Sequence, residues 1–202
     1  MGRFKITKQD TFIDMTPMSD VMVLLLTFFM LTATFVKEEP VKVNAPGSVS
    51  EVKIPTSKLL TIFVEKNGKV FLNLDTPGAM RRVAQQVNQD QNAEVISDIN
   101  EFAQVPMFGT PLDQVNAWLR LDDRNGYLAK NPNAGVPCDS VNDELKVWVR
   151  AAVEALGEDS IRIAIKADKT TPYKNVKYVI NSLRSEHQNR YNLITSLSGA
   201  ED

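Results

Sequence analysis

The segment LLTIFVEKNGKVFLNL, residues 59–74, gives the clearest structural signal in this chain. Two runs of apolar and β-branched residues, which favour strands, flank the dipeptide Asn67-Gly68. Asn and Gly tolerate the positive φ angles of a type I′ turn, which is a common connection between antiparallel strands. The segment therefore predicts a β-hairpin with a type I′ turn at Asn67-Gly68.

Helical patterns follow the hairpin. Thr-Pro occurs at Thr16, Thr76, Thr110 and Thr171, and each time it opens a predicted helix, because Thr is a good N-cap and Pro suits the first helical position. Ser140 is the predicted cap of a further helix. In the part of the chain after the hairpin, apolar residues recur at helical spacing in residues 75–89, 109–123, 140–156 and 171–185.

Two more strands are predicted, at IRIAI (residues 161–165) and NLITSL (residues 192–197). Together with the hairpin and the helices, they predict an α+β domain over residues 59–202, with a small sheet and helices on one face. Residues 76–138 form an insertion in this domain. Within it, residues 123–139 read as loop, and Trp118 is predicted to be a core residue between helix and sheet rather than an aromatic that docks a partner.

The region before the domain has three parts. Residues 37–58, KEEPVKVNAPGSVSEVKIPTSK, contain three prolines and few large apolar side chains, so they predict an extended, mobile linker. Residues 15–36 predict a transmembrane helix, because Pro17 to Val36 contain one charge and would span about 30 Å as a helix. Residues 1–14 form an N-terminal tail whose basic residues place it in the cytoplasm.

The one charge in the predicted transmembrane helix is Asp20, in DMTPMSDVMVLLLTFFMLTATF, residues 14–35. With Thr16 as cap and Pro17 as first helical residue, Asp20 lies a full turn inside the helix, where a charge costs at least about 2.5–3.5 kcal/mol. Asp20, Thr27 and Thr34 follow one another at intervals of seven residues and form one narrow polar stripe. Such a stripe suits a hydrated path or a polar partner helix.

Two alternatives to this interpretation stay open. A cleavable signal peptide also combines a basic start with an apolar middle, but Asp14 and Asp20 and the poor cleavage site around Thr32 to Thr34 argue against it. Asp20 could also extend its carboxylate toward the cytoplasmic interface instead of lying inside the membrane.

Composition gives no support to enzyme chemistry. Charged residues make up 24% of the 202 residues and the net charge is −2, which implies neither nucleic acid nor a strongly acidic partner. Cys138 and His187 are the single cysteine and histidine, too few for a disulfide framework or a zinc site. They are predicted to be a half-buried packing cysteine and a solvated helix histidine. Asp168, after the 161–165 strand, is predicted to be structural. No cofactor is expected.

The segment DMTPMSDVMVLLLTFFMLTATF resembles the transmembrane signature of the ExbD/TolR biopolymer transport family: Thr-Pro, an Asp three residues after the Pro, then Val-Met and an aliphatic and aromatic run. IRIAIKADKTTPYKNVKYVINSLRSEHQNRYNLITSL, residues 161–197, resembles the family's closing strand, helix and strand. Two features depart from the family: Ala45 replaces the usual leucine before Pro46, and residues 76–138 have no counterpart in its short members.

The resemblance implies a subunit of a bacterial inner-membrane motor. Its partners would be an ExbB/TolQ/MotA-like polytopic channel subunit, a second copy of the chain, and a TonB- or TolA-like periplasmic rod. The family's proton-carrying aspartate falls on Asp20, with Thr27 and Thr34 on the same helix face. Val41, Val43 and Pro46 become weaker candidates for partner binding, and residues 37–202 would lie in the periplasm.

Two function hypotheses follow. The first is a subunit driven by the proton-motive force that energises a TonB-like partner, with a TolR-like envelope role or a gliding or secretion motor as variants. The second is a non-conducting anchor that carries a periplasmic peptide or cell-wall binding module, with Asp20 serving assembly alone. They differ in what replacing the carboxyl group of Asp20 does to activity.

Overall fold

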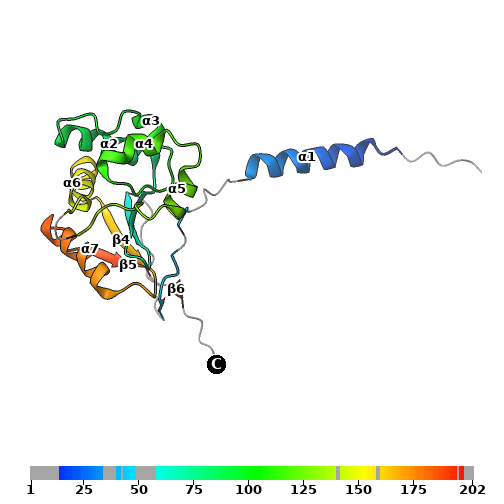
Figure 1. Cartoon of the computed structure of the whole chain (residues 1–202). Coiled ribbons are helices and arrows are strands. Elements are labelled where there is room, and N and C mark those ends of the chain that lie inside the picture. Colours follow the sequence, from blue (N-terminus) through cyan, green and yellow to red (C-terminus); the bar gives the residue numbers. More distant parts are fainter. Residues whose placement is uncertain are drawn as a thin grey trace, which may run out of the picture. The chain divides into compact units, whose positions relative to one another are not determined.

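The computed structural model describes residues 14–33, 40–41, 43–48, 58–139, 142–157, 160–194 and 196–197 (Figure 1). The chain divides into two units, Met1–Lys37 and Glu38–Asp202. In the first unit the structure describes one helix, α1 (Thr16–Thr32). The second unit holds the described sheets and helices α2 to α7, and its fold is α+β.

A four-stranded mixed sheet forms the centre of the second unit. β2 (Leu59–Val64) and β3 (Val70–Leu74) pair antiparallel, and β4 (Arg162–Ala167) and β5 (Tyr191–Leu193) continue the sheet in parallel, in the order β3-β2-β4-β5. The predicted hairpin and the predicted strand at 161–165 are confirmed. Most of β2 and the centre of β4, residues 163–165, are buried, which is typical of parallel pairs inside a domain.

The hairpin turn differs from the predicted type I′ turn. Glu65 N–H donates to the Lys69 carbonyl (3.0 Å), which closes a three-residue loop, and Gly68 N–H donates to the Glu65 carbonyl (2.8 Å). Gly68 has φ +84°, whereas Asn67 is not among the residues with positive φ. A three-residue loop of this kind needs only one left-handed residue, at its end, and Gly68 supplies it.

Helices cover the sheet. Figure 1 shows α6 and α7 beside each other, next to β4 and β5. The 140–156 helix begins at Leu145 and not after Ser140, which lies outside the described residues. Residues 124–130, predicted to be loop, form a helix, because the Asp123 carboxylate accepts from Gly126 N–H (2.8 Å) and caps it. The helices are α2 (Pro77–Asp90), α3 (Ile99–Phe102), η1 (Leu112–Gln114), α4 (Val115–Leu119), α5 (Arg124–Lys130), α6 (Leu145–Leu156) and α7 (Tyr173–Ser185).

The insertion is part of the hydrophobic core. Phe102 and Phe108 of the insertion contact Trp148 of α6, with ring centroids 5.8 and 4.5 Å away. All three rings are at most 1% exposed, and Trp118 is also 1% exposed, which confirms the prediction that it is a core residue. The insertion and the rest of the domain therefore share one core.

The insertion also covers one edge of the sheet. Leu72 of β3 exchanges two backbone hydrogen bonds with Phe108 (2.8 and 2.9 Å), and Val136 N–H donates to the Val70 carbonyl (2.8 Å). At the other end of the sheet, NLITSL forms two short strands instead of one, β5 and β6 (Ser196–Leu197). β6 pairs in parallel with β1 (Gly47–Ser48), which belongs to the region before the domain.

Candidate functional site

The start of α1 is capped differently from the prediction. Thr16 is the first helical residue and Met15 occupies the N-cap position. The Asp14 carboxylate accepts hydrogen bonds from Thr16 N–H (2.9 Å) and from the Thr16 hydroxyl (2.5 Å), so it satisfies a donor at the helix start. Both bonds favour the charged form and lower the pKa of Asp14. Asp20 still lies beyond the first turn of the helix.

The structure describes two residues of the predicted polar stripe. Asp20 and Thr27 are seven residues apart in α1 and fall within about 20° of each other around its axis. The Thr27 hydroxyl donates to the Leu24 carbonyl of its own helix (2.9 Å). Its oxygen lone pairs therefore remain available to accept a bond. Thr34 lies outside the described residues.

Apart from Asp20 and a few hydroxyl residues, the surface of α1 is apolar, and none of its residues is buried. A helix that is apolar all round is typical of a buried or membrane position, because water would contact all of that surface. None of the helices in the described ranges combines the length and the hydropathy that a membrane crossing requires. The large apolar residues of α1, each at least 51% exposed, are Met18, Val21, Met22, Val23, Leu24, Leu25, Leu26, Phe28, Phe29, Met30 and Leu31.

Part of the predicted mobile linker is docked on the domain, which corrects that prediction for residues 40–48 as far as they are described. Val41 and Val43 are 6% and 7% exposed and belong to the core, whereas Pro46 is exposed. Asn44 N–H donates to the Asp168 carboxylate (3.1 Å), and the Asn44 carbonyl accepts from Lys169 N–H (2.9 Å). Of the three candidate partner-binding residues, only Pro46 is exposed in this arrangement.

Asp168 is one of the residues that hold this segment. Its carboxylate also accepts from Thr170 N–H (2.9 Å) and from the Thr170 hydroxyl (2.6 Å). These bonds stabilise the carboxylate and lower the pKa of Asp168. The structure thus gives Asp168 the structural role predicted for it, and adds the contact with Asn44, 124 residues earlier. No local sequence pattern could have linked the two residues.

Cys138 has the half-buried position predicted for it, and His187 is exposed as predicted but lies in the turn after α7 and not in a helix. Cys138 is half-buried, with its sulfur 3.5 Å from the Ser182 hydroxyl oxygen, and burial raises the pKa of its thiol to about 11. His187 is exposed and follows α7 with φ +58°. Within the described ranges, no group of three or more His, Cys, Asp or Glu side chains could hold a metal ion.

Comparison with known proteins identifies the family. Residues 7–198 match the family described as biopolymer transport protein ExbD/TolR. A similar protein is the biopolymer transport protein ExbD of Aquifex aeolicus, which is 25% identical over 114 residues, covering 50% of this chain and 85% of the relative. No solved structure matches the chain. Because the family match extends over nearly the whole sequence, the chain belongs to the ExbD/TolR family of biopolymer transport proteins.

Proposed function

We propose that this protein is the proton-carrying subunit of an ExbB-ExbD-type inner-membrane motor and energises a TonB-like partner for outer-membrane transport. Membership of the ExbD/TolR family already supports the coarser role, an energy-transducing subunit in biopolymer transport. The observation that carries the finer proposal is a single carboxylate, Asp20, beyond the first turn of a helix whose surface is otherwise apolar.

In this proposal residues 15–36 are the membrane anchor, with the N terminus in the cytoplasm and the α+β domain in the periplasm. The basic residues Arg3, Lys5 and Lys8 support this orientation. The apolar sequence continues beyond the last described residue of α1 to Val36, which lengthens the proposed anchor. The hydroxyls of Ser19, Thr27 and Thr32 already donate to carbonyls of the same helix, which reduces the cost of placing them among lipid.

Asp20 would take up and release the proton. A desolvated wall favours the neutral carboxyl group, whereas water or hydrogen-bond donors favour the carboxylate, so movement between two such surroundings couples protonation to motion. Each proton that crosses 100 mV releases about 2.3 kcal/mol. One helix encloses no pathway, so the motor needs a polytopic ExbB/TolQ-like partner and a second copy of this chain. Thr27 and Thr34 would extend the polar surface toward the periplasm.

The α+β domain would pass this motion to the TonB-like rod. β5 is the last strand of the four-stranded sheet, and β4 is its partner among the described strands of that sheet. Its outer edge could accept an extended segment by strand addition, since the opposite edge is covered by the insertion. Val41 and Val43 could bind a partner only after the docked segment is released, because both are buried.

The test is the Asp20→Asn variant in cells, scored for proton-gradient-dependent transport and for recovery of the membrane complex by pull-down. Asn keeps the size and part of the hydrogen bonding but carries no titratable proton. We expect transport to be lost while the complex is recovered in normal amounts. Asp14→Asn is the matched control, because it changes the same group outside the apolar segment and Asn also caps helices.

Two results would contradict the proposal. Transport at the wild-type level in Asp20→Asn would show that Asp20 carries no proton and would favour the non-conducting anchor. Loss of the complex together with transport would assign Asp20 to assembly. A TolR-like envelope role, or a gliding or secretion motor, would appear as an Asp20-dependent defect in envelope integrity, motility or secretion with outer-membrane uptake intact.

A further inference from the structure

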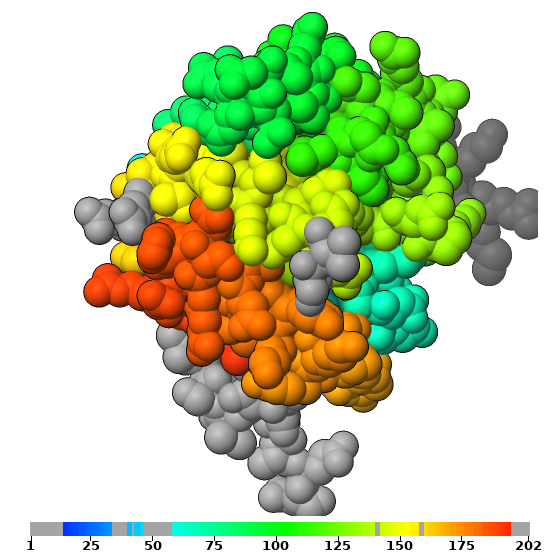
Figure 2. All heavy atoms as spheres, turned by 60° about the vertical axis from the view of Figure 1, so that its left-hand side comes forward, coloured from blue at the N-terminus to red at the C-terminus, as the bar shows by residue number. Residues whose placement is uncertain are grey.

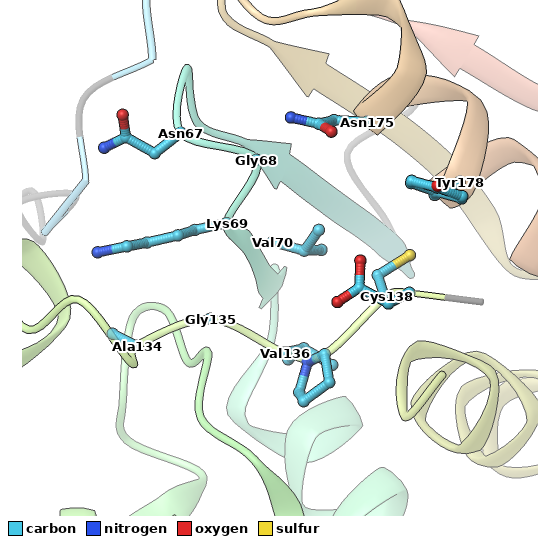
Figure 3. A pocket seen from close by; sticks show the side chains of 12 residues that line it. Asn67, Gly68, Lys69, Val70, Ala134, Gly135, Val136, Cys138, Asn175 and Tyr178 are labelled. Carbon is cyan, nitrogen blue, oxygen red and sulfur yellow. The ribbon is translucent and has the colours of Figure 1, made fainter. Parts of the chain in front are cut away.

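A polar groove crosses the domain where the insertion meets the rest of the fold. Two adjoining cavities of about 330 and 160 Å³ share Cys138, Asp139 and Tyr178. Figure 2 looks onto the face formed by α6 (yellow) and α7 (orange), with the hairpin (cyan) at its right edge. Figure 3 shows the larger cavity, with Asn175 and Tyr178 coming from α7 and the extended segment 134–139 opposite them.

The extended segment 134–139 is held firmly, so this wall of the groove is preformed. Gly135 N–H donates to the Gly109 carbonyl and Val136 N–H to the Val70 carbonyl, each at 2.8 Å. The Pro137 carbonyl accepts from Glu144 N–H at 3.0 Å. A preformed site costs less ordering on binding than one that must fold around its ligand.

The hairpin turn packs closely on α7 at the end of the groove where Asn175 lies. A Cβ added to Gly68 would lie 2.4 Å from the Asn175 side-chain nitrogen, and the positive φ of Gly68, +84°, also favours glycine here. Along α7, residues 175, 178, 182 and 185 lie on one face and line the two cavities. They extend over about 15 Å at 1.5 Å per residue, which matches four to five residues of extended chain.

The groups along the groove are suited to a peptide backbone. The Asn175 carboxamide and the Tyr178 hydroxyl make no hydrogen bond within the described part of the chain. A carboxamide carries both a donor and an acceptor, so it can pair with the N–H and C=O groups of a peptide. Asn67, in the hairpin turn that borders the larger cavity, offers a second carboxamide.

Beside Cys138 the groove has an unpaired negative charge, whereas the positive charge of Lys69 lies on its other side. Lys146 lies 3.3 Å from the Asp143 carboxylate, and the Lys69 ammonium donates to the Asn131 carbonyl (2.7 Å), on the side away from Cys138 in Figure 3. Asp139 is exposed, borders both cavities and has no side-chain partner in the described ranges. A Lys or Arg side chain on a bound segment would complement it.

We propose that this groove binds an extended peptide segment of a partner protein, four to five residues long, with a Lys or Arg side chain directed at Asp139. The site depends on the insertion, because residues 134–138 form one of its walls. It goes beyond the proposed motor function and is independent of it, since binding here requires neither a membrane potential nor Asp20.

The chain's only cysteine gives a direct probe, because Cys138 lies in the wall of both cavities. The alkylation rate of Cys138 would be measured at pH 9 on the full chain in detergent micelles. The added probes are the pentapeptide Ac-Ser-Ala-Lys-Ala-Ser-NH2, its counterpart with Glu in place of Lys, and the trisaccharide of N-acetylglucosamine. We expect the Lys peptide to slow alkylation in a saturable manner and the Glu peptide to bind more weakly.

Amino-acid substitutions distinguish the contribution of the Asp139 charge from that of the rest of the groove. Asp139→Asn should weaken binding of the Lys peptide about two- to fivefold, as expected for a solvent-exposed ion pair, and Asp122→Asn, an exposed acid that lines neither cavity, should not. Asn175→Ala should weaken the binding of both peptides. Absence of protection by either peptide would overturn the proposal, as would protection by the trisaccharide alone. Equal binding of the Lys and Glu peptides would overturn the assignment of Asp139.

Discussion

Replacement of Gly109 by Ala tests how tightly the insertion is fitted to the sheet. A Cβ at position 109 would lie 2.3 Å from Cδ1 and 3.0 Å from Cε1 of the Phe71 ring. Phe71 is on β3 and is fully buried, so its ring has no free space to enter. Gly109 does not have a positive φ, and backbone strain therefore adds nothing. Overpacking of this kind costs about 1–3 kcal/mol of unfolding free energy.

The matched control is Gly78→Ala. Gly78 lies in the first turn of α2, and a Cβ there would meet nothing within 4 Å. Because Ala loses less chain entropy than Gly on folding, this change should stabilise the domain by about 0.4–1 kcal/mol. The same substitution should thus have opposite effects at two glycines in the same unit.

Urea unfolding of the full chain in non-ionic detergent, followed by tryptophan fluorescence, measures both effects. Trp118 and Trp148 are the only tryptophans and both are buried in the α+β domain, so the signal reports this domain and not α1. An unfolding free energy for Gly109→Ala within about 0.5 kcal/mol of wild type would refute the reasoning. It would mean that the 105–110 segment moves away from β3 at little cost.

Two further predictions concern the docked segment and the core. Asp168→Asn should weaken the attachment of residues 40–48 and speed hydrogen exchange at the Asn44 amide. In the wild type the same release should occur as the pH falls through the lowered pKa of Asp168. The carboxylate stabilises the docked segment fully above the ordinary pKa of 3.8, and this stabilisation is lost when Asp168 is protonated. Unchanged exchange at Asn44 at acidic pH would count against this role. Trp148→Ala should cost about 3–5 kcal/mol in urea unfolding, because it removes the buried ring that packs against both Phe102 and Phe108. A loss below about 1 kcal/mol would mean that the cluster closes over the gap.

The sequence predicted the elements whose signals are local. The hairpin, the 161–165 strand and α7 follow from hydrophobic periodicity and turn residues, and the core position of Trp118 follows from an apolar helix face. Cap chemistry was less reliable. Thr76 accepts from Ala79 N–H (3.3 Å) as predicted, but at 110 and 171 the N-cap position is occupied by the following proline.

Apart from the local Asp123 cap of α5, the features that were missed depend on contacts between distant residues. α5 was predicted to be loop because of its Asn and Gly, yet Leu128 is buried in the core and tertiary packing outweighs its weak propensity. The burial of Val41 and Val43 depends on Asp168 and on β6, which are far away in the sequence. The groove combines four chain segments, from residues 67–70, 134–139, 143–146 and 175–185, none of which has a recognisable motif.

Docking of the described part of residues 40–48 shortens the chain that connects α1 with the α+β domain. Seven residue steps separate Ala33, at the end of α1, from Pro40, and an extended chain of that length covers at most about 25 Å. If the segment were released as far as Lys58, the maximum would rise to about 90 Å. The segment is held by the burial of Val41 and Val43, by the bonds of Asn44 to Asp168 and Lys169, and by the β1–β6 pairing. Only if all of these contacts were released would this maximum length more than triple.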